Sequence, residues 1–119
     1  MAKFANDSVM DAALDKVATS TILCLNTAQP ADRAAAISDN LIPEATPSFT
    51  GPVDGDTSGR KLTVDASNGN TADVTGTATH VSLSDGTDLL YVTTCASQAI
   101  TSGNTVNIGS WDIEISDPT

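Results

Sequence analysis

Length, composition and charge already exclude several classes of protein. The chain has 119 residues, with 15 acidic against 5 basic side chains and a formal charge of −10. A charge this negative repels nucleic acid and anionic membrane surfaces, so we expect neither as a partner. The sequence contains no run of 18 apolar residues and no secretory leader pattern, so we expect neither a membrane span nor export.

The length fits a single domain, predicted here over residues 1–119, with one modest hydrophobic core. The apolar fraction of 39% consists mostly of Ala, Val, Ile and Leu, because aromatic residues make up only 3% of the chain. Thr, Ser, Gly and Asn are abundant. This composition is typical of β-strands and turns.

The first predicted element is an amphipathic helix over residues 7–18. Its apolar side chains recur at three- and four-residue spacing and are Val9, Met10, Ala13, Leu14 and Val17. Ser8 with Asp11 resembles a capping box, and Asn6 or Asp7 is an alternative cap. We keep two roles open for this helix, which either closes one edge of a sheet or forms an arm that docks on a neighbouring subunit.

The segment between this helix and the β-rich remainder of the chain contains signals for a strand, a short helix or loop, and turns. STILCLN at 20–26 is rich in β-formers and predicts a strand. Residues 30–41 form either a second short helix or an ordered loop. Three prolines and the turn signal DGDTSG at 54–59 then indicate a Pro/Gly-rich connector over 43–59. We therefore expect residues 1–42 to hold a partly helical N-terminal arm and the first strand.

From residue 60 to residue 119 an alternation of period two predicts antiparallel strands. In RKLTVDA, the residues Leu62, Val64 and Ala66 share one face. The Asn-Gly pair within 68–70 predicts a turn that ends this strand.

A hairpin is predicted over residues 75–95, with its turn at Asp85–Gly86. Alternation leaves open which face of its return strand, LLYVTTC, is buried. The inward side chains expected in this hairpin are Thr79, Val81, Leu83, Leu90 and Val92.

After a predicted turn at 102–104, the segment TVNIGSWDIEI forms the last strand. Its apolar residues change phase half-way along. A bulge at Gly109–Ser110 would bring both halves to the core side. The five residues concerned are Val106, Ile108, Trp111, Ile113 and Ile115. As the largest of them, Trp111 is expected to fill the core and to need a polar partner for its indole N–H.

Turns at intervals of roughly 8–17 residues complete the prediction of fold class. We predict a mainly β domain, an antiparallel β-sandwich or a partly closed barrel with a short N-terminal amphipathic helix.

Candidate reactive residues are few. His80 and Cys95 lie on strands of one hairpin, but no residue pattern supplies an activated thiolate or an oxyanion loop. Cys24 and Cys95 are expected to be reduced and buried, with a disulfide between them as the alternative. Asp54 and Asp56 resemble the start of a calcium loop, yet the remaining ligands are missing. We therefore predict no enzyme activity, no cofactor and no metal.

Several segments together resemble a group of small tailed-bacteriophage proteins. They are MAKFANDSVMDAALD, CLNTAQP, GDTSGRKLTV, GTATHVSLSDGTDLLYVTTC and GNTVNIGSWDIEISDP. The resemblance implies a virion component made in the host bacterial cytoplasm. It fits a capsid decoration (cement) protein on the capsid surface, with the major capsid protein and further copies of itself as partners. The alternatives are a neck, tail or head-fibre subunit, or an acidic inhibitor of a host protein that mimics DNA.

Five residues are expected to contact such partners, because each is unusual for its segment and has no evident role in a sheet. They are Lys3 and Phe4 in the N-terminal arm, Phe49 in the connector, and the basic pair Arg60 and Lys61. Phe4 could instead pack back on the helix that follows it, and the basic pair could bind this chain's own surplus of Asp.

Overall fold

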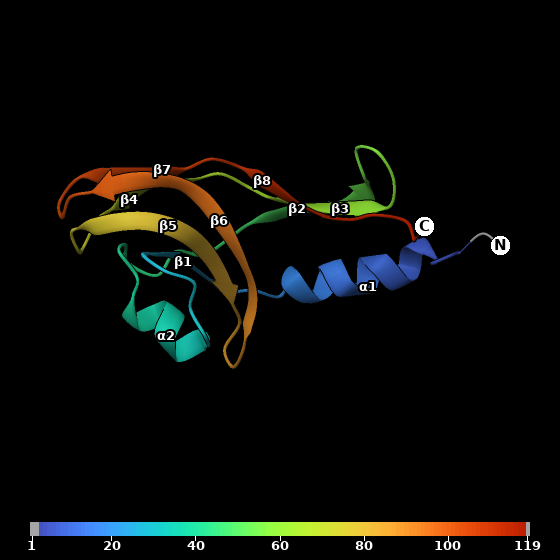
Figure 1. Ribbon diagram of the computed structural model, residues 1–119, viewed down its shortest axis with the longest axis horizontal. Coiled ribbons are helices and arrows are strands. Elements are labelled where there is room, and N and C mark those ends of the chain that lie inside the picture. Colours follow the sequence, from blue (N-terminus) through green and yellow to red (C-terminus); the bar gives the residue numbers. More distant parts are fainter. Residues whose placement is uncertain (1–2, 119) are drawn as a thin grey trace.

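The computed structural model describes residues 3–118 and confirms a mainly β fold with a short N-terminal helix (Figure 1). The helices are α1 (Asp7–Val17) and α2 (Arg33–Ser38). The strands are β1 (Ile22–Asn26), β2 (Phe49–Asp54), β3 (Arg60–Val64), β4 (Ser67–Thr71), β5 (Gly76–Ser84), β6 (Leu89–Ile100), β7 (Thr105–Ile108) and β8 (Trp111–Ile115).

Within the described residues the strands form three antiparallel sheets, with the orders β1-β5-β6, β2-β3-β8 and β4-β7. Strands β5 and β6 curve over the sheets that contain β4, β7 and β8 (Figure 1), so the arrangement is sandwich-like rather than a closed barrel. The molecule is elongated, with principal extents of 54 × 26 × 22 Å.

The last predicted strand is two strands, β7 and β8, separated at Gly109 and Ser110. The pairs Val64–Trp111 and Ser67–Ile108 keep one register across this break, because the facing chain leaves its own ladder there as well. The break is therefore not a bulge of one extra residue. The prediction that both halves of this segment face the core is nevertheless confirmed, since all five of its apolar residues belong to the core or pack against it.

The Asn-Gly pair at 68–70 does not make the predicted turn. Gly69 has φ +75°, but it lies inside β4, where the register with β7 shifts between Ser67 and Asn70. The left-handed glycine conformation thus accommodates an irregularity in a strand rather than a hairpin. This prediction was wrong because a local Asn-Gly signal does not specify which of the two structures forms.

The β5–β6 hairpin is confirmed, with its turn between Ser84 and Leu89. An irregularity between Ala78 and His80 changes the face that β5 presents. Ala78 is buried in the core in place of the predicted Thr79.

On the return strand β6 the core side differs from the expected one. Tyr91, which pairs with the fully buried Leu83, packs against the core together with Cys95. Because side chains alternate along a strand, Leu90 and Val92 lie on the opposite face.

Residues 40–45 close one side of the sandwich. Leu23 and Ala45 exchange two backbone hydrogen bonds of 2.7 and 3.2 Å, and the carbonyl of Leu41 accepts the N–H of Asp73 at 2.9 Å. The predicted connector is therefore partly regular structure, and it also contains β2. A proline-rich segment can pair in this way at the edge of a sheet.

Helix α1 begins at an Asn6 cap, whose Oδ1 accepts the backbone N–H of Ser8 at 2.9 Å. The cap is therefore Asn6 rather than the alternative capping box. Met10 and Leu14 are buried one turn apart, as predicted. Val9 is 64% exposed, so its predicted place on the apolar face is wrong. It flanks the face that Met10 and Leu14 define.

Candidate functional site: an open groove between sheet edges

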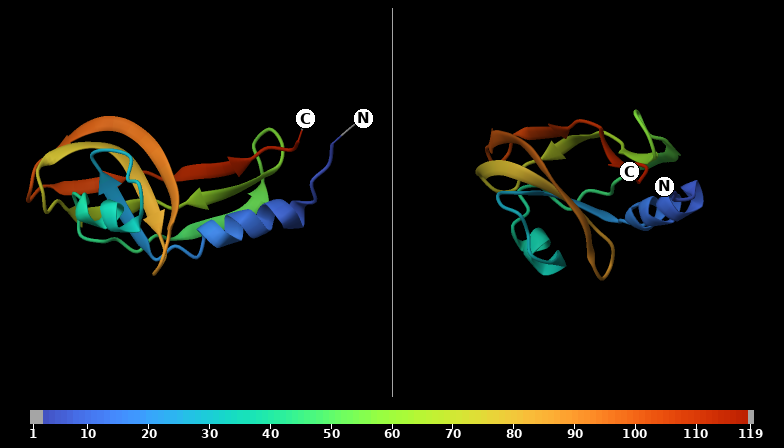
Figure 2. Two further views of the ribbon diagram at one scale, coloured as in Figure 1. Left: turned by 60° about the horizontal axis from the view of Figure 1, so that its bottom comes forward. Right: turned by 45° about the vertical axis from the view of Figure 1, so that its right-hand side comes forward.

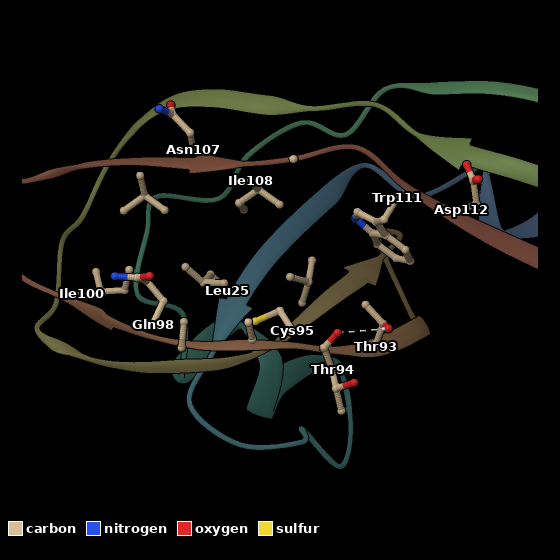
Figure 3. Close-up of a pocket in the computed structure, with 15 residues that line it drawn as sticks. Leu25, Thr93, Thr94, Cys95, Gln98, Ile100, Asn107, Ile108, Trp111 and Asp112 are labelled. Carbon is tan, nitrogen blue, oxygen red and sulfur yellow. Dashed lines mark hydrogen bonds between the residues drawn. The ribbon is translucent and has the colours of Figure 1, made fainter.

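The side of the sandwich opposite residues 40–45 is open. Strand β6 is the last strand of its sheet, and β7 and β8 are the last strands of theirs, so three strand edges face this side without ladder partners among the described residues. Two adjoining cavities of about 430 and 390 Å³ lie between β6 and the β7–β8 strands. We call this space the open-side groove (Figure 3).

The groove is lined by apolar side chains together with uncharged polar ones such as Gln98 and Asn107, and it carries very little charge. The side chains of Leu25, Cys95 and Ile108 project into it from three strands, and Trp111 lies at one end (Figure 3). Asp112 is the one charged residue that lines it in the described part of the chain, and its carboxylate accepts the hydroxyl of Thr63 at 2.7 Å and lies 3.7 Å from Nζ of Lys61. A groove of this size with a largely uncharged lining fits an extended peptide segment or a single large side chain.

A long uncharged run of sequence builds the β6 and β7 edges of the groove. Residues 89–111, between Asp88 and Asp112, contain no Asp, Glu, Lys, Arg or His, and no other stretch between charged residues is as long. Proteins commonly protect edge strands with charges or prolines. Here neither is present along β6, so its free backbone groups are accessible to pairing. This run is the sequence signal for the groove, and motif spacing alone does not reveal it.

Trp111 packs against the core, as predicted, and stacks on Tyr91 with ring centroids 5.8 Å apart. Its indole N–H is buried without a hydrogen-bond partner, so the expected polar partner is missing from the described part of the chain. Burying an indole donor without a partner is unfavourable. Trp111 is therefore positioned by stacking and apolar contact.

The two cysteines are free thiols on different faces of one sheet. Cys24 on β1 is buried toward α2, and burial raises the pKa of its thiol to about 11. Cys95 lines the open-side groove, and burial raises the pKa of this thiol as well. Strand β5 separates the two strands, which places them roughly 10 Å apart. That separation exceeds the reach of a disulfide.

His80 and Cys95 do not form a reactive pair. His80 is opposite Thr94 in the β5–β6 ladder, and its Nδ1 lies 2.8 Å from the hydroxyl of Thr79. Cys95 follows Thr94 in the strand, so its side chain lies on the other face. The thiol also has a raised pKa, which disfavours the thiolate that a nucleophile needs.

The structure separates the five predicted contact residues into three groups. Lys3 and Phe4 are exposed before α1, and Phe4 is 83% exposed rather than packed on the helix. Phe49 is half-buried at the start of β2 and packs against the core. Arg60 and Lys61 begin β3. None of the five lines the open-side groove.

The basic pair binds carboxylates of its own chain. Arg60 donates from Nε to Asp11 at 2.8 Å and from Nη1 to Asp54 at 2.7 Å, which joins α1 to the β2–β3 hairpin (Figure 2). Lys61 donates to Asp56 at 2.6 Å. Hydrogen bonding to Asp11 raises the pKa of Arg60. Of the two roles that the sequence left open for the basic pair, partner contact or binding to this chain's own Asp residues, the structure shows the second.

These same contacts occupy the candidate calcium-loop residues, Asp54 and Asp56. Within residues 3–118 no group of three or more His, Cys, Asp or Glu side chains is arranged to hold a metal ion. No helix in this part of the chain has both the length and the apolar character needed to cross a membrane.

Comparison of the chain with protein-family models, with curated proteins and with solved structures gives no significant match.

Proposed function

We propose that this protein is a structural component of a bacteriophage virion, and specifically a capsid decoration protein that binds at capsomer junctions and stabilises the head. The observation that carries the proposal is the open-side groove with its uncharged β6 and β7 edges on an otherwise acidic molecule. Such edges bind proteins by adding strands to a sheet. The resemblance of the sequence to small phage proteins supplies the context.

The charge distribution supports a protein partner over nucleic acid. The chain has few cations, and Lys16, Arg60 and Lys61 are already bound to carboxylates of the same chain. Binding to a phosphate backbone needs free Lys and Arg side chains. A host-directed DNA mimic is also less well supported, because Asp side chains here serve turns and ion pairs rather than one continuous acidic row.

A decoration role uses many weak contacts. Each copy buries limited surface, but an icosahedral shell repeats the contact many times, and linked copies are retained more strongly than single ones. The acidic remainder of the surface would keep decorated particles from adhering to one another.

Quantitative mass spectrometry of purified particles of the encoding phage tests this proposal. Hundreds of copies per particle are expected for a capsid decoration protein. A dozen or fewer would instead identify a neck, tail or head-fibre subunit, and absence from particles would overturn every virion role.

A further inference from the structure

The described segment that precedes α1 is largely exposed. Residues 3–6 run away from the sheets at one end of the molecule (Figures 1 and 2). Phe4 is 83% exposed, the most exposed large apolar side chain in the described chain. Asn6 is extended, with φ −67° and ψ 142°, so the segment enters α1 in a strand-like conformation. An exposed aromatic side chain on an extended segment is well suited to docking in a groove.

The open-side groove suits this segment in size, and the segment is opposite in charge to the molecule that carries the groove. Its larger cavity, about 430 Å³, has apolar walls that suit the ring of Phe4. The one charge in residues 3–6 is that of Lys3, which is opposite in sign to the net charge of −10 on the copy that would receive the segment. Both flanking edges have backbone groups without ladder partners in residues 3–118, which an extended segment can use.

The segment of the same molecule is held away from this groove. Helix α1 is fixed by the buried Met10 and Leu14 and by the ion pair between Asp11 and Arg60. Bringing Phe4 to the groove of its own chain would require this helix to detach. The occupant therefore comes from another molecule.

We propose that residues 3–6 of one copy dock in the open-side groove of a second copy, with Phe4 in the larger of its two cavities. The uncharged run at 89–111 allows two molecules of charge −10 to approach along this side. Reciprocal docking produces a dimer, and head-to-tail docking produces a ring or chain. The inference concerns the isolated protein and does not depend on the virion role.

Disulfide trapping tests the contact directly. The full chain carrying Cys24→Ser and Ala5→Cys retains Lys3 and Phe4, and its second thiol is the native Cys95 in the groove. Mild oxidation should produce intermolecular disulfides between residues 5 and 95, identified by peptide mapping. Replacing Cys95 by Ser in this background should abolish them.

A matched variant controls for random collision. Cys24→Ser with Val53→Cys places a thiol at another exposed position, where the native side chain is 45% exposed. It should produce at least tenfold less disulfide to residue 95. The proposal would be overturned if thiols at positions 5 and 53 formed disulfides with Cys95 in equal yield. It would also be overturned if the only disulfides joined the position-5 thiols of two copies.

Sedimentation of the unmodified protein gives an independent measure. Self-association should weaken at least tenfold with Phe4→Ser and stay unchanged with Val9→Ser, a matched change of an apolar side chain on α1 that is 64% exposed. A native chain that stays monomeric at all concentrations would overturn the docking. Particle composition would then still decide the virion role separately.

Discussion

Asp85 shows how a single side chain determines where the longest hairpin turns. Its Oδ1 accepts the backbone N–H groups of Thr87 at 2.7 Å and Asp88 at 2.6 Å, and its Oδ2 lies 3.6 Å from Nζ of Lys16. The two backbone donors close the turn through the side chain, as Asp commonly does. The backbone N–H of Asp88, followed by that of Thr87, holds the pKa of Asp85 below its ordinary value.

We predict a pH-dependent difference between the native chain and Asp85→Asn. A folded-state pKa below the unfolded value, about 3.9 for Asp, stabilises the fold above that value and loses its effect as pH falls through the folded pKa. The amide retains an acceptor oxygen but not the charge. Thermal melts should therefore show the native chain more stable above about pH 5. The difference should shrink as pH falls below about 4.

Asp88→Asn is the matched control, because the Asp88 carboxylate makes no hydrogen bond or ion pair within residues 3–118. The difference in melting temperature between Asp88→Asn and the native chain should vary far less with pH. Parallel pH profiles for the two variants would contradict the role assigned to Asp85.

At the scale of elements, a buried polar network attaches α2 to the outer face of its sheet. Asn26 on β1 is fully buried and donates from Nδ2 to the carbonyl of Ala36 in α2 at 2.9 Å. Its Oδ1 accepts the hydroxyl of Ser82 on β5 at 2.6 Å. The network therefore joins a helix and two strands. Ser84 is also buried on β5, but its hydroxyl has no hydrogen-bond partner among the residues that the structure describes.

This contrast predicts opposite results for one substitution at two neighbouring positions. Ser82→Ala leaves Oδ1 of Asn26 without its partner and should lower the free energy of unfolding by about 1–3 kcal/mol. Ser84→Ala removes a hydroxyl that is already unpaired and should leave stability unchanged or raise it slightly. Urea unfolding of both variants measures the two effects. Equal destabilisation would show that volume, not hydrogen bonding, determines the stability of this face.

At the scale of the whole molecule, a charge of −10 on 119 residues acts against the compact state. The close ion pairs of Arg60 and Lys61 offset part of this repulsion, with N–O distances of 2.6 to 2.8 Å. Acidic side chains farther apart still repel one another over a Debye length of roughly 30 Å at 0.01 M salt.

We therefore predict that sodium chloride stabilises the protein. Raising the salt from about 0.01 to 0.15 M shortens the Debye length to about 8 Å and screens the long-range repulsion more than the close ion pairs. The melting temperature at pH 7 should rise by roughly a few degrees. Potassium chloride at equal ionic strength should have the same effect. A falling melting temperature would mean that the ion pairs outweigh the repulsion.

The sequence by itself determined the features that arise from local periodicity. Alternation placed Leu62, Val64, Val81 and Leu83 in the core, and three- and four-residue spacing identified α1, because both patterns follow from backbone geometry within one element. The hairpin turn at Asp85 was equally local.

Only the tertiary structure decided how strand edges meet. The inward position of Tyr91, the strand inside the predicted connector and the closure of one side by residues 40–45 depend on pairing between distant segments. The open-side groove is of the same kind, because an edge is free or covered according to which strands pair elsewhere. Local pattern specifies the faces of a strand, whereas its neighbours are selected by the packing of the whole chain.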